Sequence, residues 1–138
     1  MSSVFIIDIA CFLSAIFFSI LFLQSGFDKL INRSDNITYF RESFSKTYFN
    51  HYILLLFWII TFLECVTGFV CSFSLLFLLS PTTIPLAYNG ILIGLILSNV
   101  TIICLFMGQR IAKDYAGAAS LAGYFLISLM GLLLLNFV

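Results

Sequence analysis

Residues 52–79 read YILLLFWIITFLECVTGFVCSFSLLFLL, an almost unbroken run of apolar side chains. It holds a single charged side chain, Glu64, and is longer than the roughly 20 apolar residues that cross a bilayer as an α-helix. A helix is the expected conformation, because it satisfies its own backbone hydrogen bonds away from water. The stretch therefore predicts a membrane-spanning helix.

Three further apolar runs lie at about residues 4–31, 86–107 and 116–138. The chain of 138 residues is 62% hydrophobic and 9% charged, whereas soluble domains carry about 25% charge. Short connectors make successive helices run in opposite directions. We therefore predict an all-α fold, in which residues 1–138 form one transmembrane domain, an integral membrane antiparallel four-helix bundle. Such a chain has little room for an extramembrane catalytic domain within these residues.

The basic residues indicate the orientation in the membrane. Six Lys and Arg balance six Asp and Glu, so the chain has no basic surface that would bind nucleic acid. All six lie within residues 29–46 or 110–113, whereas the connector at residues 80–85 is uncharged. Basic connectors stay in the cytoplasm. We therefore predict a multi-pass membrane protein with both termini outside the cytoplasm.

The first connector, residues 32–50, contains a helical pattern of apolar side chains. Ile37, Phe40, Phe44 and Tyr48 recur at spacings of three and four, with polar residues between them. This spacing predicts a short interfacial helix between the first two spans, lying on the cytoplasmic surface. An ordinary loop over the inner mouth of the bundle is the alternative.

Glu64 lies near the middle of its apolar run, where a charged side chain costs roughly 2.5 kcal/mol or more on insertion scales. We expect it to be neutral or paired and to face the bundle interior. Asn99, at a comparable depth in the third run, is the candidate partner. Two hypotheses remain open for Glu64, a hydrogen-bonded structural carboxyl and a proton or ligand site.

A second, weaker polar cluster is expected at the outer ends of the spans. Asp8 lies near the start of the first run and should face Tyr88, Asn89 or Asn136, which reach the same side. Interfacial placement alone also explains these residues.

Polar residues gather at the predicted cytoplasmic ends of three helices. One hypothesis is that Arg110 and Lys113 donate hydrogen bonds to an anionic or quinone-like headgroup, with Tyr115 as an aromatic wall. The alternative is that the basic residues snorkel to the interface, set the topology and pair with acidic neighbours. We expect no metal site and no covalently bound cofactor. The group comprises Gln24, Asp28, Lys29, Gln109, Arg110, Lys113, Asp114 and Tyr115.

Small residues in the last run indicate close helix packing. Ala119 and Gly123 lie one turn apart, as small residues do where helix backbones approach each other. Packing within the bundle and packing against a partner subunit both remain open. Gly68, one turn after Glu64, is assigned the same role.

Three local patterns resemble the DoxX-like family of small bacterial membrane proteins. They are the segment 23–30 (LQSGFDKL), Glu64 followed by Gly68, and the polar segment 109–117 that leads into a small-residue helix. The resemblance implies a four-helix bundle in the bacterial inner (cytoplasmic) membrane. It also implies that residues 26–29 and Glu64 occupy recurrent family positions. Some family members accompany subunits of membrane oxidoreductases, including a thiosulfate:quinone oxidoreductase.

The resemblance favours an accessory subunit of an inner-membrane oxidoreductase or respiratory complex, with a quinone or lipid as the candidate ligand. Its partners would be membrane lipids and other membrane-protein subunits. Two alternatives remain, a structural or assembly subunit of another membrane machine and a small proton-coupled transporter centred on Glu64. We do not expect catalysis by the chain alone, because no nucleophile, base and orienting group can be placed together.

Overall fold

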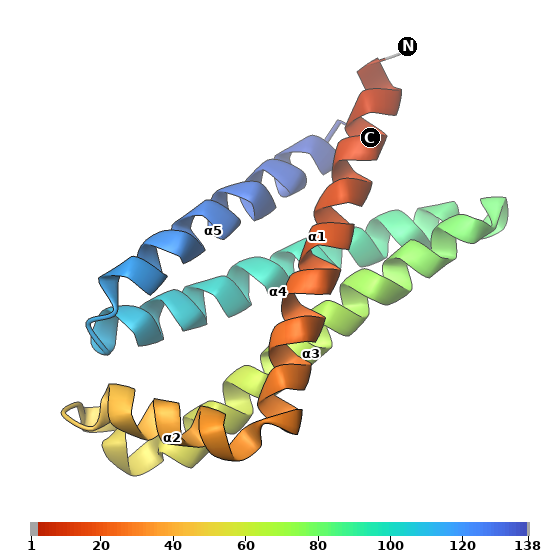
Figure 1. The fold of residues 1–138 in the computed structure, drawn as a ribbon. Coiled ribbons are helices and arrows are strands. Elements are labelled where there is room, and N and C mark those ends of the chain that lie inside the picture. The colour runs from red at the N-terminus through yellow and green to blue at the C-terminus, as the bar shows by residue number, and fades with distance from the viewer. Residues whose placement is uncertain (1–2, 138) are drawn as a thin grey trace.

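The computed structural model describes residues 3–137, and this range folds into helices joined by short turns (Figure 1). The predicted all-α fold is confirmed. Residue 138, assigned to the last predicted helix, and residues 1–2 lie outside the described range. The helices are α1 (Ser3–Ile31), α2 (Arg33–Phe44), α3 (Ile53–Leu76), α4 (Ile84–Ile111) and α5 (Tyr115–Leu135), and the 3-10 turns are η1 (Tyr48–Tyr52), η2 (Phe77–Leu79) and η3 (Pro81–Thr83).

The largest difference from the predicted helix ends is in α4. Pro85 lies in its first turn, where a missing N–H costs no intrahelical bond, so the helix begins before the proline. At the other end α4 continues to Ile111 and shortens the expected connector to residues 112–114. Lys113 there has a φ of 61°, and the Asp114 N–H donates to the Gln109 carbonyl at 2.9 Å. This left-handed residue ends the helix and reverses the chain.

Contacts between α1 and α3 fix their relative direction. A Cβ added to Gly26 would lie 2.7 Å from Cys65 Sγ, and one added to Gly68 would lie 2.8 Å from the Leu23 backbone nitrogen. Residue numbers therefore rise along α1 as they fall along α3. The ribbon shows the chain reversing again from α3 to α4 and from α4 to α5 (Figure 1).

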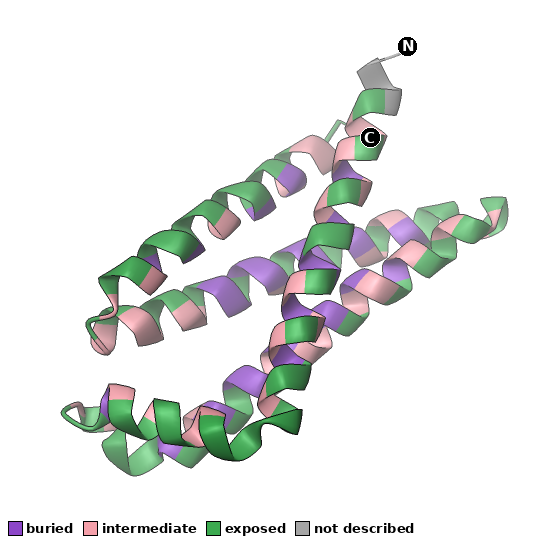
Figure 2. Ribbon diagram, viewed as in Figure 1, coloured by how far each residue is buried: buried purple, intermediate pink, exposed green. Residues whose placement is uncertain are grey.

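Buried residues occupy the faces that the long helices turn toward one another, and exposed residues cover the outside (Figure 2). Much of that outside is apolar: Leu126, Met130 and Leu133 of α5 are 61%, 62% and 66% exposed. Within residues 3–137, four helices are long and apolar enough to span a membrane, which fits a multi-pass membrane protein. The core cluster consists of Ala15, Phe18, Phe22, Cys71, Ile91, Leu95, Ile102 and Leu121.

The first connector contains the predicted helix, α2, and the loop alternative is wrong. Phe44 is buried, and the ring of Phe40 packs edge-on against Phe57 of α3 with centroids 5.5 Å apart. Tyr48 does not continue this face: it lies in η1 and is 97% exposed. The reason is that α2 ends at Phe44, whose carbonyl accepts from the Thr47 hydroxyl at 2.8 Å.

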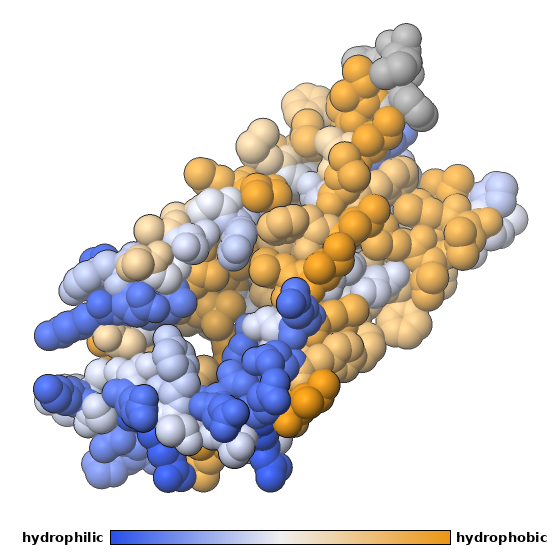
Figure 3. Space-filling model, in the orientation of Figure 1, coloured by the Kyte–Doolittle hydropathy of each residue, from blue (hydrophilic) through white to orange (hydrophobic). Residues whose placement is uncertain are grey.

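Hydrophilic side chains gather at the end of the molecule that holds α2 and the α4–α5 turn (Figure 3). In this view they form two lobes with a hollow between them, and the remaining surface is mainly hydrophobic. Both basic connectors therefore lie at one end of the bundle.

Candidate functional site

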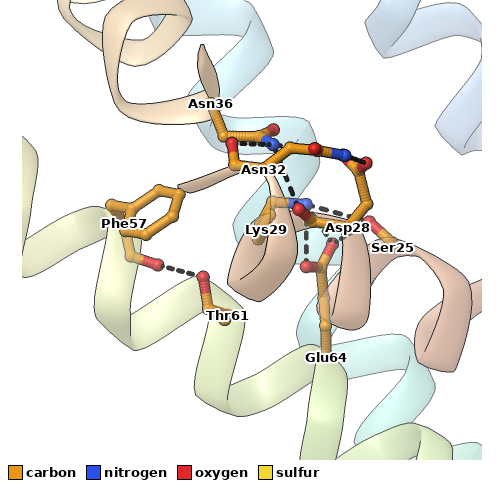
Figure 4. A network of polar contacts seen from close by, with 8 residues as sticks. All are labelled: Ser25, Asp28, Lys29, Asn32, Asn36, Phe57, Thr61 and Glu64. Carbon is orange, nitrogen blue, oxygen red and sulfur yellow. Dashed lines mark hydrogen bonds and ion pairs between the residues drawn. The ribbon is translucent and has the colours of Figure 1, made fainter. Parts of the chain in front are cut away.

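Glu64 forms a buried polar cluster with two residues of α1. Its side chain is 1% exposed, and Lys29 Nζ lies 2.8 Å from Oε2 and 3.1 Å from Oε1 (Figure 4). The Ser25 hydroxyl donates to Oε1 at 2.8 Å, and Lys29 Nζ also donates to Ser25 Oγ at 2.9 Å. Ser25 and Lys29 are one turn apart, so both point from one face of α1. The cluster holds the carboxylate paired, as a charge in an apolar surrounding requires.

Asn99 is not the partner of Glu64, and that expectation is wrong. Its amide nitrogen donates to the Leu95 carbonyl at 2.9 Å and to Ser128 Oγ at 2.8 Å. The side chain therefore turns toward α5 and joins α4 to α5. Sequence depth placed Asn99 near Glu64, but depth along the bundle does not decide which neighbour a helix face meets.

Asp28 points away from the cluster, although it precedes Lys29 directly. Its carboxylate accepts from Asn32 Nδ2 at 2.6 Å and from Asn36 Nδ2 at 3.1 Å (Figure 4). Consecutive side chains on a helix diverge by about 100°, so Asp28 and Lys29 point in different directions and contact different groups. Asp28 fixes the corner between α1 and α2.

A cavity of about 250 Å³ lies beside Glu64 and is lined by residues of α1, α3, α4 and α5. Most of its wall is apolar, but Lys29, Gln109 and Tyr124 add polar groups. Within residues 3–137, Gln109 Oε1 is buried without a hydrogen-bond donor, and Glu64 Oε2 has only its ion pair with Lys29. The remaining lining residues are Leu21, Phe22, Ser25, Ile102, Leu105 and Leu121.

An apolar pocket with a few convergent polar groups is typical of small-molecule sites. Here the polar lining residues are Ser25, Lys29, Glu64, Gln109 and Tyr124. The arrangement can orient one polar head against the cluster and enclose an apolar ring or chain along the aliphatic walls. Sequence reasoning did not single out Ser25, although it lies within the segment 23–30 and one turn before Lys29. It also missed Tyr124, which lies in an apolar run that gave no signal for it.

The other residues expected at the inner mouth do not line this cavity. Gln24 is exposed on α1. The guanidinium of Arg110 lies 4.7 Å from the ring centroid of Tyr115, an intramolecular cation–π contact at the α4–α5 turn. Lys113 is exposed in that turn, while Asp114 accepts from the Gly117 N–H at 3.0 Å. The predicted set therefore divides between the cavity, the α1–α2 corner and the α4–α5 turn.

The three small residues that were predicted to pack closely lie in different environments. Gly68 lies against the α1 backbone, as described above, and is buried between the two helices. Ala119 and Gly123 are exposed, and a Cβ added to Gly123 would meet nothing within 4 Å among the described residues. These two do not pack within the bundle, so their packing against a partner stays a prediction.

At the end of the bundle away from the basic connectors, the Tyr88 hydroxyl donates to Asp8 Oδ1 at 2.8 Å, which confirms that pairing from the expected set. The fold and the two polar clusters define a class, a helical bundle with four potential membrane spans and a buried ion pair beside a cavity. No family model, curated protein or solved structure matches the chain.

Proposed function

We propose that this chain is a DoxX-like integral membrane subunit that holds the polar head of a quinone or another membrane-dissolved lipid in the central cavity. It would act as an accessory component of an inner-membrane oxidoreductase or respiratory complex. The observation that carries the proposal is the cavity beside Glu64, whose mainly apolar wall includes the Gln109 side chain and the Lys29–Glu64 ion pair.

The chemistry of the lining supports a ligand of this class. A membrane-dissolved molecule with one polar head can form hydrogen bonds with the polar lining residues, and its apolar part replaces water along the leucine and phenylalanine walls. A volume of about 250 Å³ is small for a whole lipid, so the cavity suits the head or ring and the remainder would extend from it. In this role the chain's own residues bind and orient the ligand, while redox chemistry would belong to a partner subunit.

The test is mild purification from the source membrane, followed by mass spectrometry of retained quinones and lipids. Gln109→Leu removes the amide of a lining residue at similar side-chain size, and Gln24→Leu is the matched control at an exposed glutamine outside the cavity. We expect one small molecule enriched several-fold over bulk lipid in the wild type and the control, and lost from Gln109→Leu. Equal retention in both variants, or no enriched molecule, would overturn ligand binding here.

Identification of the co-purifying proteins tests the rest of the proposal. Stoichiometric redox subunits support the accessory role, whereas subunits of a non-redox machine would show the structural alternative to be right. The buried Glu64–Lys29 pair also favours a second candidate, a proton-coupled carrier. That candidate predicts substrate-dependent proton exchange in liposomes that is lost in Glu64→Gln.

A further inference from the structure

A second hollow lies on the outer surface, where the polar connector meets the start of α3. Its volume is about 520 Å³, and it shares no lining residue with the central cavity. Arg41 of α2 forms one side, and η1 together with the first residues of α3 forms the other. The complete lining is Arg41, Asn50, His51, Tyr52, Ile53, Leu54 and Leu55.

The lining of this groove combines polar and apolar residues. Arg41, Asn50 and His51 provide hydrogen-bond donors, and no acidic residue is among the lining. Leu54 and Leu55 follow directly and are 50% and 58% exposed, so their side chains cover the outer surface of α3. The chain therefore presents a cationic notch directly beside an exposed aliphatic strip.

The charge in the groove is not neutralised by the protein. Within residues 3–137, the ion pair is that of Lys29 with Glu64, and Arg41 has no carboxylate within 4 Å. Arg110 differs, since its guanidinium stacks on Tyr115. The guanidinium of Arg41 is thus available for the bidentate hydrogen bonds that this group forms with phosphate.

Two exposed aromatic residues lie at the groove and next to it along α3. Tyr52 is 59% exposed at the groove, and Trp58 is 44% exposed about 9 Å further along the α3 axis at 1.5 Å per residue. Tyr and Trp concentrate where a bilayer changes from headgroups to hydrocarbon. This placement sets the groove at headgroup level, with Leu54 and Leu55 at the start of the acyl region.

We propose that this groove binds the headgroup of an anionic phospholipid, with its phosphate on Arg41 and His51 and its acyl chains along Leu54 and Leu55. Charge complementarity selects the phosphate, and the aliphatic strip selects a lipid over a free anion. The site is independent of the central cavity, so either can fail without the other.

Native mass spectrometry of the full chain in mixed micelles tests the proposal, with phosphatidylglycerol or phosphatidylcholine of equal chain length as the probe. We expect the wild type to retain one phosphatidylglycerol with a several-fold preference over phosphatidylcholine. Arg41→Gln should reduce retention to the phosphatidylcholine level. Arg33→Gln is the matched control, because Arg33 is also an exposed α2 arginine but does not line the groove.

Three results would overturn the assignment. Equal losses of phosphatidylglycerol from Arg41→Gln and Arg33→Gln would show that the lipid is attracted to the basic connector as a whole. Equal retention of the two lipids by the wild type would show that charge does not select the occupant. Complete displacement by millimolar inorganic phosphate would show a free-anion site. Helical circular dichroism of both variants checks that each retains its fold, which the exposure of both side chains leads us to expect.

Discussion

Lys29 Nζ lies 2.8 Å from Glu64 Oε2, although the two residues are 35 positions apart in the sequence. The contact ties the last turns of α1 to the middle of α3, with Ser25 completing the cluster. Because the side chain of Glu64 is 1% exposed and that of Lys29 is 12% exposed, water has little access to the ion pair. The ion pair is therefore a structural clamp as well as one wall of the cavity.

Removal of the lysine should destabilise the bundle strongly. Lys29→Met leaves the Glu64 carboxylate buried without its counter-charge, and breaking a buried pair costs about 3 kcal/mol. We expect this loss in the free energy of unfolding, measured by denaturing-detergent titration of the purified protein with circular dichroism.

Two further variants test whether pairing is the cause. Lys29→Met/Glu64→Gln should recover much of the loss, because the neutral amide can still accept from Ser25. Lys46→Met, at an exposed lysine without an ion pair, serves as the control. A Lys29→Met effect no larger than that of Lys46→Met would contradict the clamp.

Gly68 and Gly123 should respond oppositely to alanine. At Gly68 the new Cβ would lie 2.8 Å from the Leu23 backbone nitrogen, and such overpacking costs about 1–3 kcal/mol. At Gly123 the added methyl meets nothing within 4 Å among the described residues, so the isolated chain should gain up to about 1 kcal/mol of helix propensity. Unfolding of the two variants side by side measures the difference, and equal effects would refute the close contact of α1 and α3.

Lys113→Gly should stabilise the α4–α5 turn. Lys113 has a φ of 61°, a region that costs a residue with a side chain about 1 kcal/mol more than glycine. We expect the free energy of unfolding to rise by roughly that amount, with Lys113→Ala as the control that removes the charge but keeps the Cβ. An equal change in both variants would show that charge, and not backbone geometry, dominates at this position.

Cysteine labelling in intact cells tests the orientation. With the four native cysteines replaced, Thr82→Cys in the uncharged turn should react with a membrane-impermeant maleimide. Lys46→Cys and Arg110→Cys should react only after the cells are opened, because basic connectors stay in the cytoplasm. Labelling of Thr82→Cys only in opened cells would reverse the predicted topology.

The helices themselves could be predicted because their signals are local. Residues 52–79 are apolar enough to require a helix in lipid, and Ile37, Phe40 and Phe44 mark one face of α2 by spacing alone. Burial of Glu64 also followed, since an isolated carboxyl in such a run must turn inward. The ends of α4 could not be predicted from local signals, because Pro85 and residues 108–111 are both compatible with a helix. The left-handed backbone at Lys113 shows where α4 stops.

Local hydropathy was therefore enough to predict the all-α class, the four long apolar segments and the need to pair Glu64. Helix packing was needed to show that Lys29 and Ser25 contact Glu64 and that Asn99 contacts Ser128. It was also needed to show that Gln109 lines a cavity while Arg110 stacks on Tyr115. The difference arises because hydropathy is a property of each residue and its near neighbours in the chain. The choice of partner depends on the rotation and register of helices that are distant in the chain, and these are set by close contacts such as Gly68 on Leu23.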